Sequence, residues 1–245
     1  MDKETKGKVK NFFLDMFFPA FCLGCGKEGS YVCPDCKELL DILQNQYCLC
    51  AKNPTLLPAE ELRGKCHKCS GRRLSGIYFA LSYKEKPLTR KLIHLLKYEP
   101  YYLKDLARPI ANIMLDHLAL IEISGETFKG RLIVPVPIDG KKIRRRGYNQ
   151  SEEIAKELSK QLGIPLVLNN LLKARTTQPQ VELLGNERES NLKDAFITKN
   201  PAEIKDKKIL LIDDVYTTGS TMEECTKVLR GAGAKEVWGL VIARD

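Results

Sequence analysis

Apolar residues from position 76 onward alternate between short continuous runs and stretches with helical spacing. Four continuous runs predict buried strands, at 77–83, 131–137, 208–213 and 236–244. Helical spacing predicts four helices, at 88–98, 102–120, 151–162 and 220–234. Two further apolar stretches, 165–172 and 195–198, bracket a polar segment, and a basic loop follows the second run. This alternation predicts an α/β fold, a mostly parallel sheet flanked by helices.

Residues 22–71 have a different pattern, rich in turns and poor in periodic apolar positions. Such a segment cannot build a conventional core and needs another source of stability. Eight of the nine cysteines lie here in four close pairs: Cys22 and Cys25, Cys33 and Cys36, Cys48 and Cys50, and Cys66 and Cys69. We therefore expect a small cysteine-rich module over residues 1–75 and an α/β domain over residues 76–245.

Cysteine pairs separated by two residues are typical zinc ligands, with two pairs holding one tetrahedral ion. The first two pairs have this spacing, and so does the last. Cys48 and Cys50 are one residue closer, which leaves the second ion open. We expect one or two structural zinc ions, with free buried cysteines as the alternative. His67 is expected at the surface rather than as a ligand.

The segment 9–17 places five apolar side chains at helical spacing: Val9, Phe12, Phe13, Met16 and Phe17. The apolar stretch is too short to cross a membrane, and Asp15 interrupts it in a way that does not fit an export signal. We expect an amphipathic helix that caps the cysteine module, with peripheral membrane contact as the alternative. Without an export signal, a cytoplasmic location is expected.

Lys and Arg number 40 against 31 acids, so the net charge is +9 and a polyanionic partner is favoured. The densest basic run follows the strand at 131–137: Lys141, Lys142, Arg144, Arg145 and Arg146. Such a run tracks a nucleic-acid backbone, holds a phosphorylated ligand or forms a solvated face. Asn149 and Gln150 lie just beyond it, placed to contact a base or a phosphate.

Two adjacent acids follow the apolar run at 208–213. Asp213 and Asp214 are expected at the carboxyl end of a parallel strand, where open α/β sheets bind ligands. The turn 216–219 should present backbone amides at the start of the next helix, which favours phosphate. Because carboxylates repel phosphate, the acids are expected to contact neutral hydroxyls. A 5-phosphorylated ribose fits both requirements, and an ordinary strand, turn and helix is the alternative.

The start of that next helix carries a capping pattern. Ser220 or Thr221 is expected to cap it, with Glu223 or Glu224 completing a capping box. A Walker A loop, which nucleotide hydrolysis of the P-loop type requires, does not occur in the sequence.

The stretch "ILLIDDVYTTGST", residues 209–221, resembles the signature of type I phosphoribosyltransferases, which bind phosphoribosyl pyrophosphate (PRPP). The resemblance implies that Asp213 and Asp214 hold the ribose 2- and 3-hydroxyls. It places the 5-phosphate on Thr217, Thr218, Gly219, Ser220 and Thr221. It also implies that Mg²⁺ accompanies PRPP, that the run Arg144 to Arg146 holds pyrophosphate or DNA, and that Arg188 in a mobile loop is a second clamp.

Further stretches resemble the ComF competence family: "LKY", "VPVPIDGKKIRRRGYNQSEEIAKEL", "RTTQPQVELLGNERESNL", "GAGAKEVWGLVIAR" and the cysteine-rich front. The resemblance implies a phosphoribosyltransferase-like domain after a double zinc ribbon. It implies a cytoplasmic factor that helps single-stranded DNA enter the cell in natural transformation, with a competence ATPase or helicase as partner. The alternative is an active phosphoribosyltransferase for an unidentified nucleobase or amine. Since His94 and His117 lie in predicted helices and no general base is evident, catalysis stays open.

Overall fold

The computed structural model describes residues 19–58, 64–84, 86–98, 102–123, 125–175, 192 and 194–245. The amphipathic helix expected at 9–17 lies outside these ranges. Within them, no helix is long and apolar enough to cross a membrane. The chain divides into two compact units, Met1–Asp41 and Ile42–Asp245. The second group of cysteines therefore belongs to the larger unit, and an independent domain ending at residue 75 stays a prediction.

The smaller unit contains one short helix, α2 (Pro34–Glu38). Cys33 precedes it and its sulfur accepts a hydrogen bond from the Cys36 amide at 3.5 Å. Pro34 suits the first helical position because its missing N–H needs no partner there. The cysteines thus shape the local backbone as well as offering ligand atoms.

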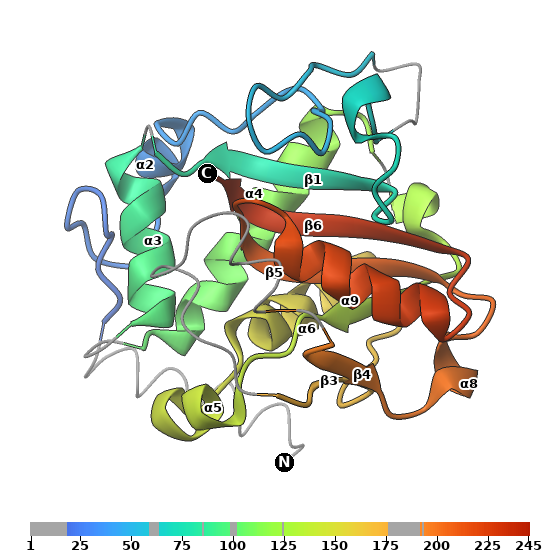
Figure 1. The fold of residues 1–245 in the computed structure, drawn as a ribbon. Helices are drawn as coiled ribbons and strands as arrows, with labels where there is room; N and C mark the ends of the chain where they lie inside the picture. Colours follow the sequence, from blue (N-terminus) through green and yellow to red (C-terminus); the bar gives the residue numbers. More distant parts are fainter. Residues whose placement is uncertain are drawn as a thin grey trace. The chain divides into compact units, whose positions relative to one another are not determined.

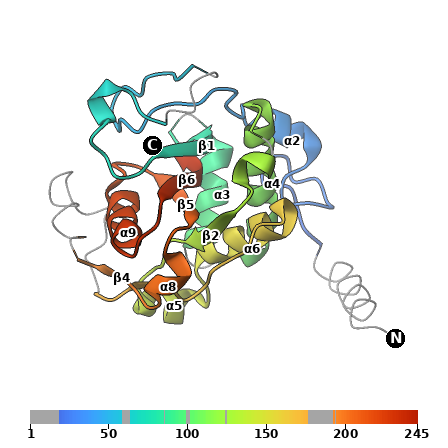
Figure 2. The ribbon, with the colours of Figure 1, turned by 90° about the vertical axis from the view of Figure 1, so that its right-hand side faces the viewer.

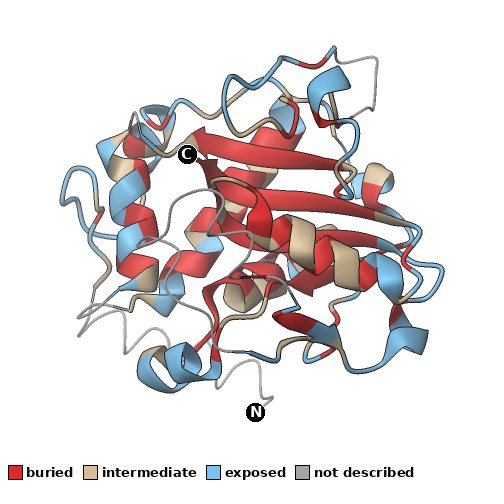
Figure 3. Ribbon diagram, in the orientation of Figure 1, coloured by how far each residue is buried: buried red, intermediate tan, exposed pale blue. Residues whose placement is uncertain are grey.

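The larger unit is built on a parallel four-stranded sheet with the order β1-β6-β5-β2 (Figure 1). The strands are β1 (Gly76–Ser82), β2 (Arg131–Pro135), β5 (Lys208–Tyr216) and β6 (Glu236–Arg244). They are buried along nearly their whole length (Figure 3), as expected of a parallel sheet covered on both faces. The predicted fold class and all four predicted strands are confirmed.

Helices cover both faces of this sheet (Figure 2). On one face, α4 (Ala107–Leu120) packs on β1 and β6, and α6 (Gln150–Leu162) packs on β2 and β5. On the other face, α9 (Ser220–Gly231) packs on β6. The remaining helix of the predicted set is α3 (Pro87–Lys97). Short 3-10 turns and one single-turn helix complete the unit: η1 (His67–Cys69), η2 (Lys104–Leu106), η3 (Gly125–Phe128) and α8 (Pro201–Ile204).

Two segments differ from expectation or refine it. The basic loop expected after β2 is a helix, α5 (Gly140–Arg146). Asp139 caps it by accepting from the Lys141 amide at 2.8 Å, and Gly147 ends it in the left-handed conformation at φ 83°. The apolar stretches at 165–172 and 195–198 contribute a separate antiparallel pair, β3 (Leu171–Lys173) and β4 (Phe196–Thr198).

The chain changes face between the neighbouring strands β2 and β5. After β2 it continues into α6 on one face, whereas after β5 it continues into α9 on the other. The connections diverge at the carboxyl ends of these two strands. Open α/β sheets bind their ligands at such a switch point.

Candidate functional site

The two acids lie at this switch point. Strand β5 continues through Tyr216, so Asp213 and Asp214 lie within the strand rather than at its last residue. Its neighbour β2 ends at Pro135, which pairs with Ile212. The acids therefore begin where the adjacent strand stops. Both are largely buried, with 9% and 3% of their surface exposed.

Side chains from two helices contact the acids. The Ser151 hydroxyl, in the first turn of α6, donates to Asp213 Oδ1 at 2.9 Å. The Lys97 ammonium, at the last residue of α3, pairs with Asp214 Oδ1 at 2.7 Å. The second carboxylate oxygen of Asp214, Oδ2, is buried and has no hydrogen-bond partner among the described residues. A buried carboxylate oxygen without a donor is costly, and a ligand hydroxyl would satisfy it.

Burial and neighbouring charges shift the pKa values of Asp213 and Lys97. Burial and the negative charge of Asp214 raise the pKa of Asp213 to about 7, against the opposing effect of Lys97. Burial lowers the pKa of Lys97, but its ion pair with Asp214 outweighs this and the net shift is upward. The site thus holds a firmly charged lysine beside a carboxyl group that ionises near neutral pH.

The 217–221 loop follows the acids and leads into α9. Gly219 is the residue before the helix, with φ 83°, and no side chain caps the helix start. Ser220 consequently lies inside the first turn, where its hydroxyl bonds that of Thr218 at 2.8 Å. The expected capping box is wrong, because the glycine occupies the capping position. The Glu223 carboxylate instead accepts from the backbone amides of Arg73 and Leu74, at 2.9 and 3.3 Å.

Lysines from three elements lie near one another: Lys97 in α3, Lys142 in α5 and Lys173 in β3. Partial burial and the nearby charges of Arg146 and Lys97 lower the pKa of Lys142 in α5. Burial and the charge of Lys142 lower the pKa of Lys173 in β3. Lysines close enough to lower each other's pKa form a positive region, which favours an anionic ligand.

The arginines of α5 divide into two groups. Arg144 and Arg145 are exposed. Arg146 is partly buried, donates a short hydrogen bond to the Gln150 side-chain oxygen and lies 6.0 Å from the centre of the Tyr102 ring. Arg145 also donates to the Tyr102 hydroxyl at 3.2 Å. Arg144 and Arg145 thus lie on the exposed side of α5, whereas Arg146 is held against Gln150.

Asn149 and Gln150 already have partners within the chain. Asn149 caps α6 by accepting from the Ser151 amide at 3.1 Å and donates to the Val136 carbonyl at 2.9 Å. Gln150 accepts from Arg146. Their expected ligand contacts stay predictions. Arg188, the expected second clamp, lies outside the described residues.

The eight clustered cysteines form two groups. The first cysteine cluster is Cys22, Cys25, Cys33 and Cys36, and the second cysteine cluster is Cys48, Cys50, Cys66 and Cys69. In each, the four sulfur atoms lie within 4.8 Å of one another. Four sulfurs around a tetrahedral zinc, about 2.3 Å from the metal, are about 3.8 Å apart, so each cluster has the size to hold one ion. The closer spacing of Cys48 and Cys50 is accommodated, and the exposed His67 is not a member of the second cluster.

In each cluster, at least one cysteine thiol has a lowered pKa. Burial raises the pKa of Cys22, but hydrogen bonds, the largest from the Cys33 amide, outweigh it and lower the pKa to about 6. In the second cluster, burial likewise raises the pKa of Cys66, but hydrogen bonds from the Cys69 amide and from the Cys50 and Cys48 thiols outweigh it and lower the pKa to about 6. Thiolate is the form that binds a metal, so each cluster offers at least one ready ligand.

Comparison with known proteins identifies the family. The model described as "Phosphoribosyl transferase domain" matches residues 148–244. "Competence protein F" of Haemophilus influenzae is 41% identical over 116 residues, 45% of this chain and 50% of that protein. "DNA utilization protein YhgH" of Escherichia coli K12 is 32% identical over 157 residues, 63% of this chain and 67% of that protein. The chain belongs to the ComF family.

A third ComF relative matches most of the chain. "Competence protein ComFC" of Streptococcus pneumoniae is 26% identical over 212 residues, 86% of each protein. The match to the Haemophilus influenzae relative, by contrast, spans half of that protein's length. Among solved structures, a purine phosphoribosyltransferase from Pyrococcus horikoshii has a TM-score of 0.33 at 20% identity, covering 60% of this chain and 86% of that one. A likeness of that size carries no argument about function.

Three residues of the ComF site escaped the sequence analysis. Lys97 and Ser151 contact the acids, and Arg72 contacts the 217–221 loop. The family motif "LKY" contains Lys97 but says nothing of its partner. Arg72 follows the last cysteine pair, and the cysteine pattern predicts only metal ligands there.

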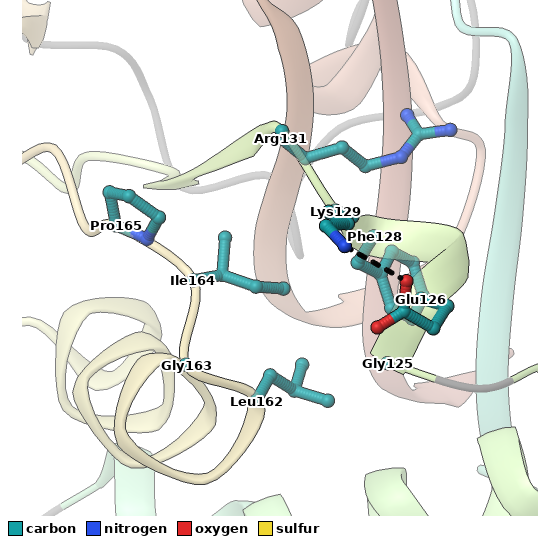
Figure 4. A pocket seen from close by; sticks show the side chains of 10 residues that line it. Gly125, Glu126, Phe128, Lys129, Arg131, Leu162, Gly163, Ile164 and Pro165 are labelled. Carbon is teal, nitrogen blue, oxygen red and sulfur yellow. Dashed lines mark hydrogen bonds and ion pairs between the residues drawn. The ribbon is translucent and has the colours of Figure 1, made fainter.

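A separate cavity lies at the opposite end of β2 (Figure 4). Its volume is about 460 Å³, and Leu162 and Ile164 line it across from Phe128 and Lys129. Arg131, the first residue of β2, has its guanidinium directed away from this space. Asp213 and Asp214 in β5 lie beside the last residue of β2, whereas this cavity lies beside its first, so the cavity is no part of the candidate site.

The raised pKa of Asp213 predicts a pH-dependent effect of Asp213→Asn on stability. Since the folded state holds this proton up to about pH 7, ionisation costs stability progressively from about pH 4 to 7. The amide variant lacks this cost, so its stability relative to wild type should improve by roughly 1–3 kcal/mol between pH 4.5 and pH 8. Urea unfolding at both pH values measures it. Asp206→Asn, at an exposed position, is the control, and parallel profiles for Asp213→Asn and wild type would contradict the assignment.

Metal analysis tests the two clusters separately. The purified chain should carry close to two zinc ions, and Cys25→Ala and Cys50→Ala should each lose one because each removes a ligand from one cluster. Cys225→Ala, which changes a buried cysteine outside both clusters, should lose none. Elemental mass spectrometry gives the counts. A wild-type count near one zinc ion, or an unchanged count in Cys50→Ala, would contradict a zinc ion in the second cysteine cluster.

Proposed function

We propose that this chain is a ComF-type competence factor that binds PRPP with Mg²⁺ at the switch point and carries a structural zinc ion in each cysteine cluster. The observation that carries the proposal is the buried pair Asp213 and Asp214, with one carboxylate oxygen lacking a donor, directly before the 217–221 loop. Two carboxylates next to a loop with backbone amides at a helix start suit a ligand that has both hydroxyls and a phosphate.

The acids favour the ribose end of such a ligand. A carboxylate accepts hydrogen bonds and repels phosphate, so the ribose hydroxyls are suitable donors to Asp214 Oδ2 and to Asp213. Lys97 and Ser151 fix the other contacts of the two carboxylates before the ligand arrives. Fixed acceptors lower the ordering cost of binding.

The 217–221 loop favours the 5-phosphate. It opens α9, whose first-turn amides lack helical partners and attract anions. The hydroxyls of Thr218 and Ser220 lie beside these amides. Thr217 and Thr221 complete the group that we assign to phosphate.

The basic region around Lys142 and Arg146 favours the pyrophosphate end. Mg²⁺ would enter with PRPP and neutralise its phosphates when bound. Asp213 and Asp214 are the carboxylates of the candidate site that would offer further ligands to Mg²⁺. Arg188 stays our candidate for a second clamp on the pyrophosphate.

The competence role is supported by the relatives and by charge. The relatives are named competence or DNA utilization proteins, and this chain has a net charge of +9. Arg144 and Arg145 on α5 are exposed. We assign single-stranded DNA to this surface and a competence ATPase or helicase as the protein partner, acting in the cytoplasm.

An active phosphoribosyltransferase is the second candidate. Asp213, with a pKa of about 7, could exchange a proton near neutral pH, which catalysis by a general base requires. The acceptor would be a nucleobase or an amine. Neither His94 nor His117 serves the site, because His94 is exposed on α3 and His117 is buried against the Leu43 carbonyl at 2.6 Å.

Calorimetric titration tests PRPP binding. With Mg²⁺ present, wild type should bind PRPP, and the double variant Asp213→Asn, Asp214→Asn should bind at least about a hundredfold more weakly, because neutral amides replace both carboxylates. Asp206→Asn should bind as wild type does, since it removes an exposed carboxylate. A zinc-loaded, folded wild type that gives no heat would refute the PRPP site. Product formation with nucleobases then tests the enzyme candidate.

Salt dependence tests the DNA surface. Replacing Arg144 and Arg145 with Ala should weaken single-stranded DNA binding and flatten the plot of log affinity against log salt by about 1.4, because roughly 0.7 counterions are released per phosphate contact. The control removes two exposed lysines elsewhere, Lys129 and Lys199. Fluorescence anisotropy at several salt concentrations measures both variants. Equal slopes for the two double variants would contradict a specific role for α5.

A further inference from the structure

The second cysteine cluster is bonded to the ends of two sheet strands. Arg244, the last residue of β6, donates to the carbonyl of Cys48 at 2.8 Å and to that of Cys50 through a short hydrogen bond. Tyr216, the last residue of β5, donates its hydroxyl to the Leu49 carbonyl at 2.9 Å. The backbone around Cys48 is thus fixed to the strand that carries the acids.

Arg72 continues this connection to the 217–221 loop. Its backbone amide donates to the Cys69 carbonyl at 3.1 Å, so a metal ligand holds its main chain. Its guanidinium donates to the Tyr216 hydroxyl at 2.7 Å and to the Thr218 carbonyl at 3.2 Å. One side chain therefore joins the cysteine cluster, the end of β5 and the loop.

The bond to Thr218 orients the peptide that follows. In a trans peptide the carbonyl and the next amide point in opposite directions. With the Thr218 carbonyl held by Arg72, the Gly219 N–H is directed away from Arg72. Amides with a fixed direction bind an anion at a lower ordering cost than amides that must reorient.

Gly219 shows how close this packing is. A Cβ atom there would overlap the Tyr216 hydroxyl and the Arg72 guanidinium. Its φ of 83° also favours glycine. The helix side of the loop is held from the same segment, since the Glu223 carboxylate accepts from the amides of Arg73 and Leu74.

We propose that the metal in the second cysteine cluster organises the 217–221 loop through Arg72, so that metal occupancy and phosphoribosyl affinity are linked. The inference rests on the proposed PRPP site and assigns Arg72 as a positioning residue. The metal connects residues 48–50 with residues 66–69, and its loss frees the backbone from which Arg72 extends. Linkage requires the reverse effect as well, so bound PRPP raises the affinity of the second cysteine cluster for its metal.

Hydrogen exchange of the full-length, zinc-loaded chain tests the connection without any ligand. In Arg72→Ala, amides of residues 217–221 should exchange at least about tenfold faster than in wild type, because hydrogen bonds from a charged donor are lost. The zinc count should stay at two, since all ligands remain. Arg73→Ala, whose backbone amide still reaches Glu223, is the matched control and should exchange as wild type does. Equal rates in Arg72→Ala and Arg73→Ala would overturn the inference.

Metal variants complete the test. Cys50→Ala should speed exchange of 217–221 and weaken PRPP binding about tenfold, whereas Cys25→Ala, in the first cluster, should change neither. Similar loop exchange in the two cysteine variants would also overturn the inference. Where Arg72→Ala or Cys50→Ala does not fold, Arg72→Lys is tested in its place. Exchange of the loop amides faster than in wild type would support the connection through Arg72, and exchange at the wild-type rate would overturn it. A wild type that binds no PRPP refutes the proposed function, while the exchange rates still test the role of Arg72.

Discussion

The buried acid pair is the constraint on which the site depends. Two adjacent carboxylates in a parallel strand repel each other and lose hydration, and the pKa of Asp213 near 7 records that cost. Three features make the arrangement tolerable: β2 ends beside Ile212, Ser151 donates from α6, and Lys97 pairs from α3. Among the described residues, Asp214 Oδ2 stays buried without a hydrogen-bond donor. Stability is given up where a ligand can restore it, as is common at binding sites.

The second cysteine cluster belongs to this arrangement as well. It lies in the same compact unit as the sheet, and its carbonyls accept from Arg244 and Tyr216 at the strand ends. Through Arg72, the segment that holds the metal ligands also holds the 217–221 loop. The segment with the second cysteine cluster thus lies directly beside the 217–221 loop. Contrary to the expectation for residues 22–71, its Leu49 and Leu57 are buried in the hydrophobic core of the larger unit.

The sheet could be predicted because its strands are continuous apolar runs, and the acids because they follow such a run directly. Contacts from distant parts of the chain could not: nothing near Lys97 or Arg72 in sequence indicates Asp214 or Thr218. The capping box failed although its residue pattern is present, because Gly219, with positive φ, takes the capping position before Ser220. The pairing of Cys48 with the last cysteines depends on a turn that bonds the Cys48 amide to the Thr55 carbonyl, which ligand spacing does not reveal.

The central claim is that the acids and the 217–221 loop hold the two ends of a phosphorylated ribose. A crystal structure of the zinc-loaded chain with PRPP and Mg²⁺ tests it most directly. We predict ribose hydroxyls on the carboxylates of Asp213 and Asp214 and the 5-phosphate on the amides of 217–221, with Arg72 still bonded to Thr218. PRPP bound elsewhere, or a phosphate placed against the two acids, would contradict the account.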